Sequence, residues 1–428
     1  MPAPTPRAGP HRDPWWNFVR RSAEDPASAF YFERGASPGR SGRYSFFGFG
    51  PSEREEWSEP RDVSASRLRV RGNDPHRADG SWVGFVGFDA VGLFEPLLGP
   101  STPRGSPFPV ALFDRYPHVE HAHHLGAPER GAAPGLPPSP EVGEVEDSTT
   151  RDRFERSVEH LREAIYDGEA FQVVLAHRRS RRFRGSLLPV VDRLRREEHF
   201  AFLYYLRIVD GTSAGGTPIE IAGASPESVV EIRDGTVAVN PIAGTRPLPA
   251  PTRGPAARLP LDKDPKELAE HRMLVDLARN DIGRVSQVGS VHLSRRETRV
   301  PYARLEHLVS RVVGRLSNGA SAIDALVATF PAGTVSGAPK IRATELLRRE
   351  ERSWRGTYGG TVGIVTPGGE ADFALAIRSA AAAQGRVYTQ AGAGIVHLSK
   401  PAQEWEETLT KLATIERALE GTMRRVRG

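Results

Sequence analysis

The sequence predicts an α+β protein in which helices and strands are both substantial, and three observations lead to this fold class. Apolar residues recur at helical spacing in several long segments, and short apolar runs bounded by glycine and proline indicate strands. The two kinds of segment do not alternate in a regular βαβ order, and the chain of 428 residues contains no internal repeat. That length allows two or three domain equivalents or one large composite domain.

The first third of the chain has an irregular pattern that is typical of an antiparallel sheet. Residues 1–14 are rich in proline and polar side chains, so we expect this start to be disordered. Residues 15–125 form an N-terminal region, in which apolar runs at residues 44–49 and 82–88 lie between glycine and proline turns. These two runs predict strands.

A proline-rich stretch, residues 126–150, separates this region from the rest. It contains five prolines and few apolar residues, so it predicts an exposed connection. Residues 151–425 follow as a second, larger region, which we expect to carry the chemistry.

The larger region has clear periodic segments. Phe154, Val158, Leu161 and Ile165 lie at helical spacing and predict a helix that ends before Gly168. The same signals predict strands at residues 171–175 and 219–222 and helices at residues 264–284, 340–352 and 405–419.

The composition excludes several classes of function. The chain has no Cys, which excludes a disulfide framework, a Cys-ligated metal and a cysteine nucleophile. It has 58 basic and 53 acidic residues, and only five of the basic residues are Lys. Acidic and basic residues interleave, which indicates a mixed solvated surface rather than a nucleic-acid-binding stripe. No apolar stretch approaches the about 18 residues that span a bilayer, so we expect no membrane contact and a cytoplasmic protein.

Two glutamate pairs are candidate metal ligands. Glu267 and Glu270 lie three residues apart on one face of the predicted helix 264–284, and Glu404 and Glu407 repeat this spacing far downstream. Lys411 extends the second stripe. Mg²⁺ takes hard oxygen ligands and completes its shell with waters or an anionic substrate. Either pair taken alone is also typical of an exposed acidic helix face.

Two glycine-rich segments indicate where an anionic ligand would lie. Residues 333–340 run directly into a helix, where free backbone N–H groups and the helix dipole favour an anion, although the pattern is not that of a P-loop. Residues 391–396 let backbone approach a ligand without side-chain obstruction. Two tight turns are the alternative. Together with four carboxylates, these segments predict a site for a small carboxylated ligand held through Mg²⁺.

Other candidates are weaker. The clustered histidines His118, His121, His123 and His124 have no fixed helical spacing and no carboxylate to support them as ligands, which indicates an exposed loop or strand. Residues around Ser336 do not form the Gly-x-Ser-x-Gly motif of a nucleophilic serine.

Seven strings of residues resemble motifs of the chorismate-utilising enzymes, in particular component I of anthranilate synthase and its relatives. The resemblance is dense from residue 154 to 420. The strings are residues 43–46, 168–175, 223–227, 241–247, 266–281, 330–340 and 391–396. This resemblance implies the chorismate-binding fold, with two large, mostly antiparallel β-sheets packed as a sandwich, helices outside and the site between the sheets.

The resemblance also implies roles for individual residues. Glu270 and Glu407 would ligate Mg²⁺ with support from Glu267 and Glu404, and the metal would hold the ring carboxylate of chorismate. Glu227 would protonate the departing C4 hydroxyl. Further substrate contacts are implied for Gly244, Thr245, Thr334, Tyr358, Arg378, Gly392, Ala393 and Gly394, and further catalytic roles for Gln172, Thr245, Arg304, His307 and Lys411.

Two positions indicate amination at C2 of the ring. Relatives that add water at C2 have a Lys where this chain has Gln172, and an amide cannot act as general base for water. Many 4-amino-4-deoxychorismate synthases have a Lys in place of Ala243 that bonds covalently to the ring. We therefore expect ammonia as nucleophile and 2-amino-2-deoxyisochorismate as product. A 4-amino-4-deoxychorismate synthase and an inactive chorismate-binding paralogue are the alternatives.

Two departures from the family pattern affect later steps. Anthranilate synthases carry a His one turn before His307 that assists loss of pyruvate, and this chain has Arg304 there. A guanidinium does not deprotonate at working pH. We therefore hypothesise that the enzyme releases the C2 adduct before pyruvate is eliminated. Residues 30–34 replace the Leu-Leu-Glu-Ser string at which regulated members bind tryptophan, so we expect no tryptophan feedback.

The absence of Cys bears on the nitrogen source. Glutamine amidotransferases of the kind that supply this family use a cysteine nucleophile, which this chain lacks. We therefore expect ammonia from a separate glutamine amidotransferase subunit. The pathway that the product enters and a homo-oligomeric state stay open.

Overall fold

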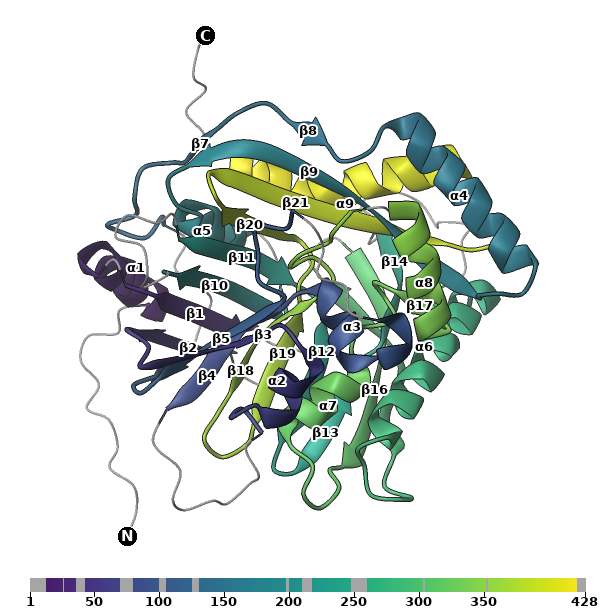
Figure 1. Ribbon diagram of the computed structural model, residues 1–428, viewed down its shortest axis with the longest axis horizontal. Coiled ribbons are helices and arrows are strands. Elements are labelled where there is room, and N and C mark those ends of the chain that lie inside the picture. The colour runs from purple at the N-terminus through teal and green to yellow at the C-terminus, as the bar shows by residue number, and fades with distance from the viewer. Residues whose placement is uncertain are drawn as a thin grey trace.

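The computed structural model of the protein contains two large antiparallel sheets with helices packed around them (Figure 1). The residues that the structure describes are 13–25, 27–35, 43–69, 80–99, 105–124, 131–197, 200–209, 218–247, 260–302, 305–351 and 353–421.

The first sheet has 11 strands among the described residues, and every pairing in it is antiparallel. Its order is β17 (Gly337–Ala338), β9 (Gln172–Arg184), β21 (Arg386–Ile395), β20 (Ser379–Ala383), β11 (Ile219–Ser225), β10 (Phe202–Ile208), β1 (Ala29–Arg34), β2 (Arg43–Phe49) and β6 (Glu120–His124). Two short strands, β7 (Glu141–Val142) and β8 (Glu146–Asp147), also pair with β9.

The second sheet has ten strands in the same described part of the chain. Its order is β14 (Ile242–Pro247), β16 (Leu305–Arg315), β13 (Thr236–Val239), β12 (Ser228–Arg233), β19 (Ala371–Leu375), β18 (Thr361–Val365), β4 (Ser81–Val86), β5 (Ala111–Tyr116) and β3 (Glu53–Trp57), with β15 (His292–Tyr302) paired to β16. Strands from residues 15–125 and from residues 151–425 thus take part in both sheets, so the two regions share one framework.

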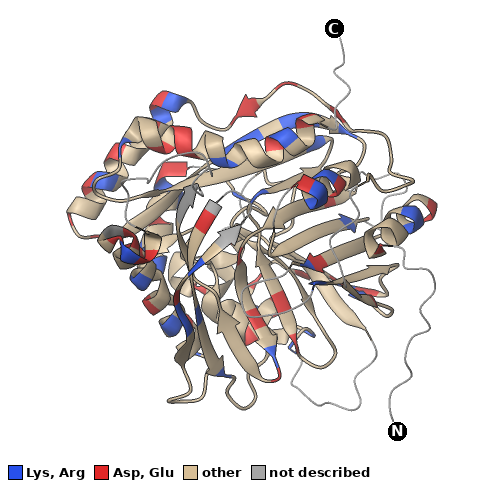
Figure 2. Cartoon of the chain, turned by 180° about the vertical axis from the view of Figure 1, so that it is seen from behind, with Lys and Arg blue, Asp and Glu red and all other residues tan. Residues whose placement is uncertain are grey.

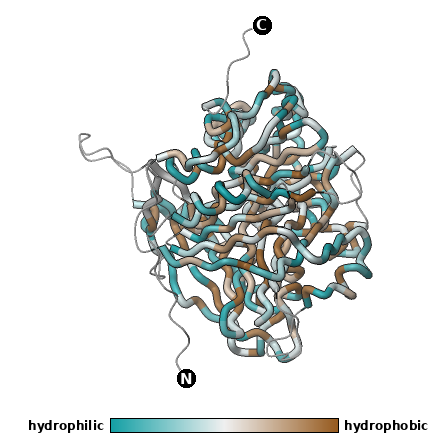
Figure 3. Tube along the Cα trace, turned by 90° about the vertical axis from the view of Figure 1, so that its left-hand side faces the viewer, coloured by the Kyte–Doolittle hydropathy of each residue, from teal (hydrophilic) through white to brown (hydrophobic). Residues whose placement is uncertain are grey.

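The two sheets pack face to face through apolar side chains. Along β1, Phe30 and Phe32 face the second sheet, whereas Ala29 and Tyr31 face the outer helices, as the two-residue period of a strand requires. The facing layer of the second sheet includes Phe85. Figure 3 shows apolar stretches of the strands in the middle of the molecule. The predicted sandwich is therefore confirmed.

Helices cover the outer faces. Along the first sheet lie α1 (Pro14–Glu24), α4 (Arg151–Tyr166), α5 (Leu188–Glu197) and α9 (Pro401–Gly421), with α9 packed along β21 (Figure 1). The helix α8 (Lys340–Glu351) packs on β9. Around the second sheet lie α2 (Pro60–Ala65), α3 (Val91–Phe94), α6 (Pro265–Gly283) and α7 (Ala322–Thr329), and the short 3₁₀ turns are η1 (Phe88–Ala90), η2 (Pro96–Leu98) and η3 (Leu261–Lys263).

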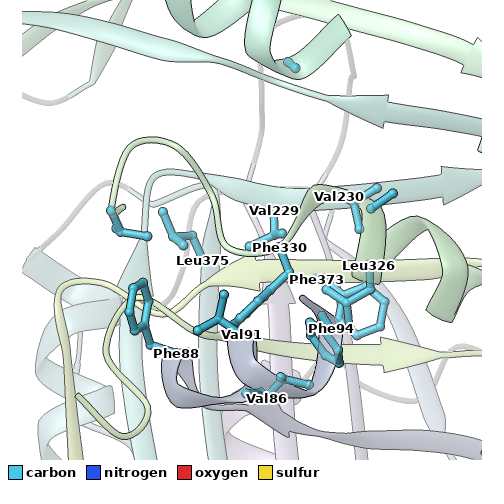
Figure 4. Close-up of a cluster of buried hydrophobic side chains, with 14 of the residues drawn as sticks. Val86, Phe88, Val91, Phe94, Val229, Val230, Leu326, Phe330, Phe373 and Leu375 are labelled. Atoms are coloured by element: carbon cyan, nitrogen blue, oxygen red, sulfur yellow. The ribbon is translucent and has the colours of Figure 1, made fainter. Parts of the chain in front are cut away.

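A second apolar cluster fixes the segment that follows α7. Phe330 points toward Val229 of β12 and Leu375 of β19, and its ring centroid lies 5.2 Å from that of Phe94 in an edge-to-face contact (Figure 4). All four residues are buried. This anchoring matters because Thr334, a predicted site residue, follows four positions later.

The elements predicted from the sequence are present, with shifts at their ends. The predicted strand at residues 171–175 is longer, because β9 runs from Gln172 to Arg184. Helix α1 begins at Pro14 with Asp13 as its N-cap, so the last two residues of the predicted disordered start are ordered, and residues 1–12 lie outside the described residues. The described part of the connection 126–150 is mostly exposed as predicted, although β7 and β8 attach it to β9.

The surface carries both signs of charge. Lys and Arg alternate with Asp and Glu along the outer helices (Figure 2), and several of them pair, as Arg151 does with Glu155 at 2.7 Å. This arrangement agrees with the mixed surface expected from the composition. Within the described ranges, no helix is long and apolar enough to cross a membrane.

We expect Phe85→Ala to cost about 3–5 kcal/mol of unfolding free energy, because Phe85 is fully buried between the sheets and its loss leaves a cavity. Denaturant titration followed by circular dichroism measures the shift in midpoint. Tyr166→Ala, at a site that is 85% exposed, is the matched control and should change stability by less than about 0.5 kcal/mol. Equal losses in the two variants would contradict the assignment of Phe85 to the sandwich core.

Candidate active site

The candidate site lies where the chain passes from one sheet to the other. Residues 226 and 227 join β11 to β12, and residues 376–378 join β19 to β20. These crossovers run side by side, because the Leu375 N–H donates to the Glu227 carbonyl at 3.0 Å and the Ala224 N–H donates to the Arg378 carbonyl at 3.3 Å. Glu227 and Arg378 therefore occupy the same corner between the sheets.

Glu227 is a buried carboxyl that accepts a hydrogen bond. The Thr334 hydroxyl donates to Glu227 Oε1 at 2.9 Å. Desolvation raises the pKa of Glu227 to about 8, and the bond from Thr334 offsets only part of this effect. The carboxyl is thus protonated at neutral pH, which is the state that a general acid needs.

Two adjacent strands bring Gly244, Thr245 and His307 to this corner. A bulge separates Ala243 from Thr245 in the pairing of β14 with β16, and Thr245 pairs with His307. Gly244 has φ +64°, and a Cβ there would lie 2.8 Å from Glu267 Oε2, so glycine lets the glutamate approach the backbone. The side chain of Thr245 lies outside the described atoms.

His307 is neutral in this environment. Burial is the main cause that lowers its pKa to about 4, and the positive charge of Arg378 adds to it, while a hydrogen bond with the backbone of Gly244 acts in the opposite direction. Arg378 itself has φ +48°, an unusual backbone conformation for a residue with a side chain. The protonation state of His307 therefore depends on the charge of Arg378 and on the backbone of Gly244.

The glycines of β21 form the opposite wall. Gly392 and Gly394 pair with residues of β9, and a Cβ on Gly392 would lie 2.9 Å from the Tyr358 hydroxyl. A Cβ on Gly394 would clash with the side-chain amide of Gln172. Burial raises the pKa of Tyr358 to about 12, so its hydroxyl stays protonated. The bare backbone of β21, with Ala393 between the two glycines, is therefore lined by two polar side chains.

Lys411 connects α9 with this wall. Its Nζ donates to the Gly392 carbonyl at 2.8 Å and lies 2.8 Å from Glu407 Oε1. Glu407 and Lys411 are one helical turn apart, and Glu404 lies in the first turn of the same helix. The second glutamate pair thus belongs to the end of α9 that is tied to β21.

The two glutamate pairs are attached to different sheets. Helix α6, which carries Glu267 and Glu270, packs on β14 and β16, whereas α9 packs on β21. Carboxylates are the donors that Mg²⁺ prefers, so the donor type fits this metal. Among the described residues, however, no three His, Cys, Asp or Glu side chains are grouped so that they could hold a metal ion. The structure brings the pairs to the two walls of the site but does not join them into one cluster.

A cavity adjoins the corner that holds Glu227. It has about 370 Å³ of empty space, part of it open to solvent, and Glu227 and Thr334 line it together with Leu274 and Leu277 of α6. Most of the other lining residues are apolar, which agrees with the raised pKa of Glu227. Arg304, the remaining predicted site residue, lies outside the described residues.

One buried group beside the site was not predicted from the sequence. Arg355 is 3% exposed and donates hydrogen bonds to the carbonyls of Val335, which follows Thr334, and of Val174, which pairs with Gly394. An arginine in an arginine-rich chain carries no distinctive sequence signal, and its partners lie far away in the sequence. Only the structure reveals its position.

Comparison with known proteins gives a consistent result. The family profile of chorismate binding enzymes matches residues 23–417. Anthranilate synthase component 1 of Pseudomonas putida is 38% identical over 379 residues, which cover 80% of this chain and 75% of that protein. The same component of Methanothermobacter thermautotrophicus is 36% identical over 429 residues, which cover 92% and 89% of the two chains.

Solved structures agree in fold. The crystal structure of anthranilate synthase component I from Streptococcus pneumoniae TIGR4 has a TM-score of 0.72 and 29% identity, covering 89% of this chain and 94% of that chain. The menaquinone-specific isochorismate synthase MenF of Escherichia coli has a TM-score of 0.71 at 20% identity, covering 97% and 93%, and so supports the fold alone.

The raised pKa of Glu227 predicts a pH-dependent stability difference between the parent chain and Glu227→Gln. In the folded state the proton stays bound up to about pH 8, whereas an unfolded glutamate releases it near pH 4.5. The parent should therefore lose stability relative to the variant between these pH values, by about 1.4 kcal/mol per pH unit, with no further loss above about pH 8. Chemical unfolding from pH 5 to 9 measures it, and a constant difference would contradict the burial of a protonated carboxyl.

Proposed function

This chain belongs to the family of chorismate binding enzymes, and from that premise we propose that it catalyses the Mg²⁺-dependent amination of chorismate at C2 with ammonia. The product would be 2-amino-2-deoxyisochorismate. The observation that carries the proposal is Glu227, a carboxyl with a pKa of about 8 at the corner between the sheets, beside Arg378 and within reach of Thr334.

Glu227 would act as the general acid. Ammonia forms a C–N bond at C2, the ring double bonds shift, and the C4–O bond breaks. The C4 hydroxyl leaves as water with the proton of Glu227, the nitrogen releases a proton to solvent to become the amine, and solvent returns a proton to Glu227. A neutral carboxyl suits this step, since it donates a proton at neutral pH and does not repel an anionic substrate.

The walls of the site would hold the two carboxylates of chorismate. The backbone amides of Gly392, Ala393 and Gly394 would take the ring carboxylate, together with Thr334 once its hydroxyl turns from Glu227 to the substrate. The neutral hydroxyl of Tyr358 and the guanidinium of Arg378 would take the enolpyruvyl carboxylate, one as a donor and one as a charge partner. Each carboxylate would thus have its own set of donors, and together these would orient the ring.

The backbone at Gly244 and Thr245 would line the ring. Gly244 has no side chain that would obstruct the ring, and Glu267 Oε2 lies close to its backbone.

The metal would be held by the two glutamate pairs. Glu270 and Glu407 would be its ligands, supported by Glu267 and Glu404, and Mg²⁺ when bound would neutralise the ring carboxylate. Lys411 would hold Glu407 at the β21 wall through its contacts with Glu407 and Gly392.

The choice of C2 rests on two uncharged residues. The amide of Gln172 lies against Gly394 and cannot remove a proton from water, which favours ammonia as the nucleophile. Ala243 cannot form the covalent bond to the ring that a lysine forms in many 4-amino-4-deoxychorismate synthases. That synthase is the second candidate, and an inactive chorismate-binding paralogue is the third.

We propose release of the C2 adduct before loss of pyruvate. Arg304 replaces the histidine that assists this loss in anthranilate synthases, and a guanidinium cannot serve as a base. Ammonia would come from a separate glutamine amidotransferase, because the chain contains no cysteine.

Tryptophan feedback is not expected. Arg34, in the segment that would bind tryptophan in regulated relatives, is buried in ion pairs with Glu231 at 2.6 Å and Asp372 at 2.5 Å. These carboxylates belong to the second sheet. The charged side chain of Arg34 therefore occupies the space between the two sheets and is neutralised there.

Incubation with chorismate, Mg²⁺ and ammonium, followed by mass spectrometry and NMR, tests the function. We expect an aminated product with nitrogen on C2, and no change of rate on adding tryptophan. Nitrogen on C4 would select the second candidate, and no turnover at high ammonium the third. Rapid, stoichiometric pyruvate with fluorescent anthranilate would overturn the release of the C2 adduct.

Removal of the metal should abolish turnover, and Mg²⁺ should restore it. We expect Glu270→Gln and Glu407→Gln to raise the Mg²⁺ concentration for half-maximal rate at least about tenfold, which corresponds to about 1.4 kcal/mol. Glu406→Gln is the matched control on α9, because Glu406 is exposed and pairs with Arg151 at 3.0 Å. A Mg²⁺ dependence that is equal in all three variants would contradict the assignment of the ligands.

A further inference from the structure

Arg355 is a buried guanidinium that links the Thr334 segment to the strand behind the β21 glycines of the candidate site. Its Nη1 donates to the Val335 carbonyl and its Nη2 to the Val174 carbonyl, both at 2.6 Å. Val335 follows Thr334, and Val174 pairs with Gly394 across β9 and β21. One side chain therefore holds the segment of Thr334 and the strand that backs the glycine wall.

Glu351 neutralises the charge of Arg355 and adds a third contact to the backbone around the site. It accepts from Arg355 Nε at 2.8 Å and from Nη2 at 2.5 Å, and it also accepts from the Ala176 N–H at 2.8 Å. Ala176 pairs with Gly392. The ion pair is almost fully buried, and its charge-assisted hydrogen bonds leave the guanidinium fixed in one orientation.

The backbone of Arg355 is held as firmly as its side chain. Asp89 Oδ2 accepts from the N–H groups of Arg355 at 3.2 Å and of Gly356 at 2.8 Å, and burial raises the pKa of this carboxyl to about 6. The Phe88 N–H donates to the Gly356 carbonyl at 2.9 Å. The N-terminal region thereby fixes the turn that continues to Tyr358.

Two aromatic rings near the guanidinium favour a planar cation at this place. The Arg355 Cζ lies 4.2 Å from the ring centroid of Phe88 and 5.7 Å from that of Tyr358. A guanidinium stacks on aromatic rings and donates in several directions in one plane, whereas a lysine ammonium has three donors on one atom. Lysine could keep the pair with Glu351 but not both carbonyl contacts.

We propose that Arg355 is a positioning residue for substrate binding, which sets the spacing of the Thr334 segment, the Gly392–Gly394 wall and Tyr358. The proposal rests on the proposed function, since these three groups would hold the carboxylates of chorismate. Arg355 acts through these groups, because its own donors are directed to Val335, Val174 and Glu351. Misplacement of such groups by about 1 Å is sufficient for large losses of rate.

The experiment compares Arg355→Lys and Arg355→Ala with the parent chain in two measurements. Steady-state kinetics with chorismate, Mg²⁺ and ammonium should give a kcat/KM at least about 30-fold lower for Arg355→Lys, with most of the change in KM. Guanidinium added to Arg355→Ala should restore kcat/KM at least about tenfold in a saturable way. Hydrogen exchange should rise in peptides that cover residues 174–176, 333–337 and 356–360 in both variants.

Arg178→Lys is the matched control. Arg178 lies on β9, as Val174 does, and contacts the turn that contains Arg355, since its Nη1 donates to the Trp354 carbonyl at 2.5 Å and its Cζ lies 3.7 Å from the Trp354 ring. Because this contact is made to Trp354 rather than to Val335 or Val174, KM should stay within about twofold of the parent value.

The outcomes separate this proposal from the proposed function. If the parent chain does not aminate chorismate, the proposed function fails, while the exchange data alone decide whether Arg355 orders the three segments. Unchanged exchange in these segments overturns the proposal. It is equally overturned if Arg355→Lys has the KM of Arg178→Lys, or if activity falls only with the folded fraction. Should Arg355→Ala not fold, the Arg355→Lys data decide.

Discussion

The pairing of two strands across the corner between the sheets is the constraint on which the rest of the site depends. β11 pairs with β20 in one sheet, and their continuations β12 and β19 pair in the other. Hydrogen bonds between the crossovers keep the ladder almost unbroken at Glu227 and Arg378. Because buried backbone groups must stay paired, neither crossover can shift without breaking bonds in both sheets. The corner therefore holds the backbone of Glu227 in a rigid frame.

The sandwich around this corner is held by apolar packing and by paired charges. Phe30 and Phe32 of one sheet face Phe85 of the other. On the same strand, Arg34 forms ion pairs with Glu231 and Asp372 of the second sheet. A buried ion pair is weak evidence of net stability, because desolvation offsets its attraction. It does restrict how the sheets can slide, since any other register would leave a buried charge without a partner.

Local sequence signals predicted the α+β class and most of the helices and strands, whereas the sandwich architecture and most of the candidate site residues were implied by the resemblance to the chorismate-utilising enzymes. The helical spacing of Phe154, Val158 and Leu161 marked α4, and the two glutamate pairs and the glycine segment of β21 were visible as patterns. These features depend on neighbours in the sequence. The role of Arg355 was not predictable, because it depends on Val174 and Asp89, which lie 181 and 266 residues away along the chain.

Burial acts on all of these groups, but the partner decides the charge state of each. Glu227 is paired with a hydroxyl donor rather than a cation, so desolvation keeps it protonated, and His307, which faces the charge of Arg378, stays neutral. Arg355 is as deeply buried as Glu227, yet Glu351 and two carbonyls keep its charge. The site thus separates a neutral corner, suited to proton donation, from a charged support behind it. The charge state of each buried group thus depends on whether the fold places a group of opposite charge beside it.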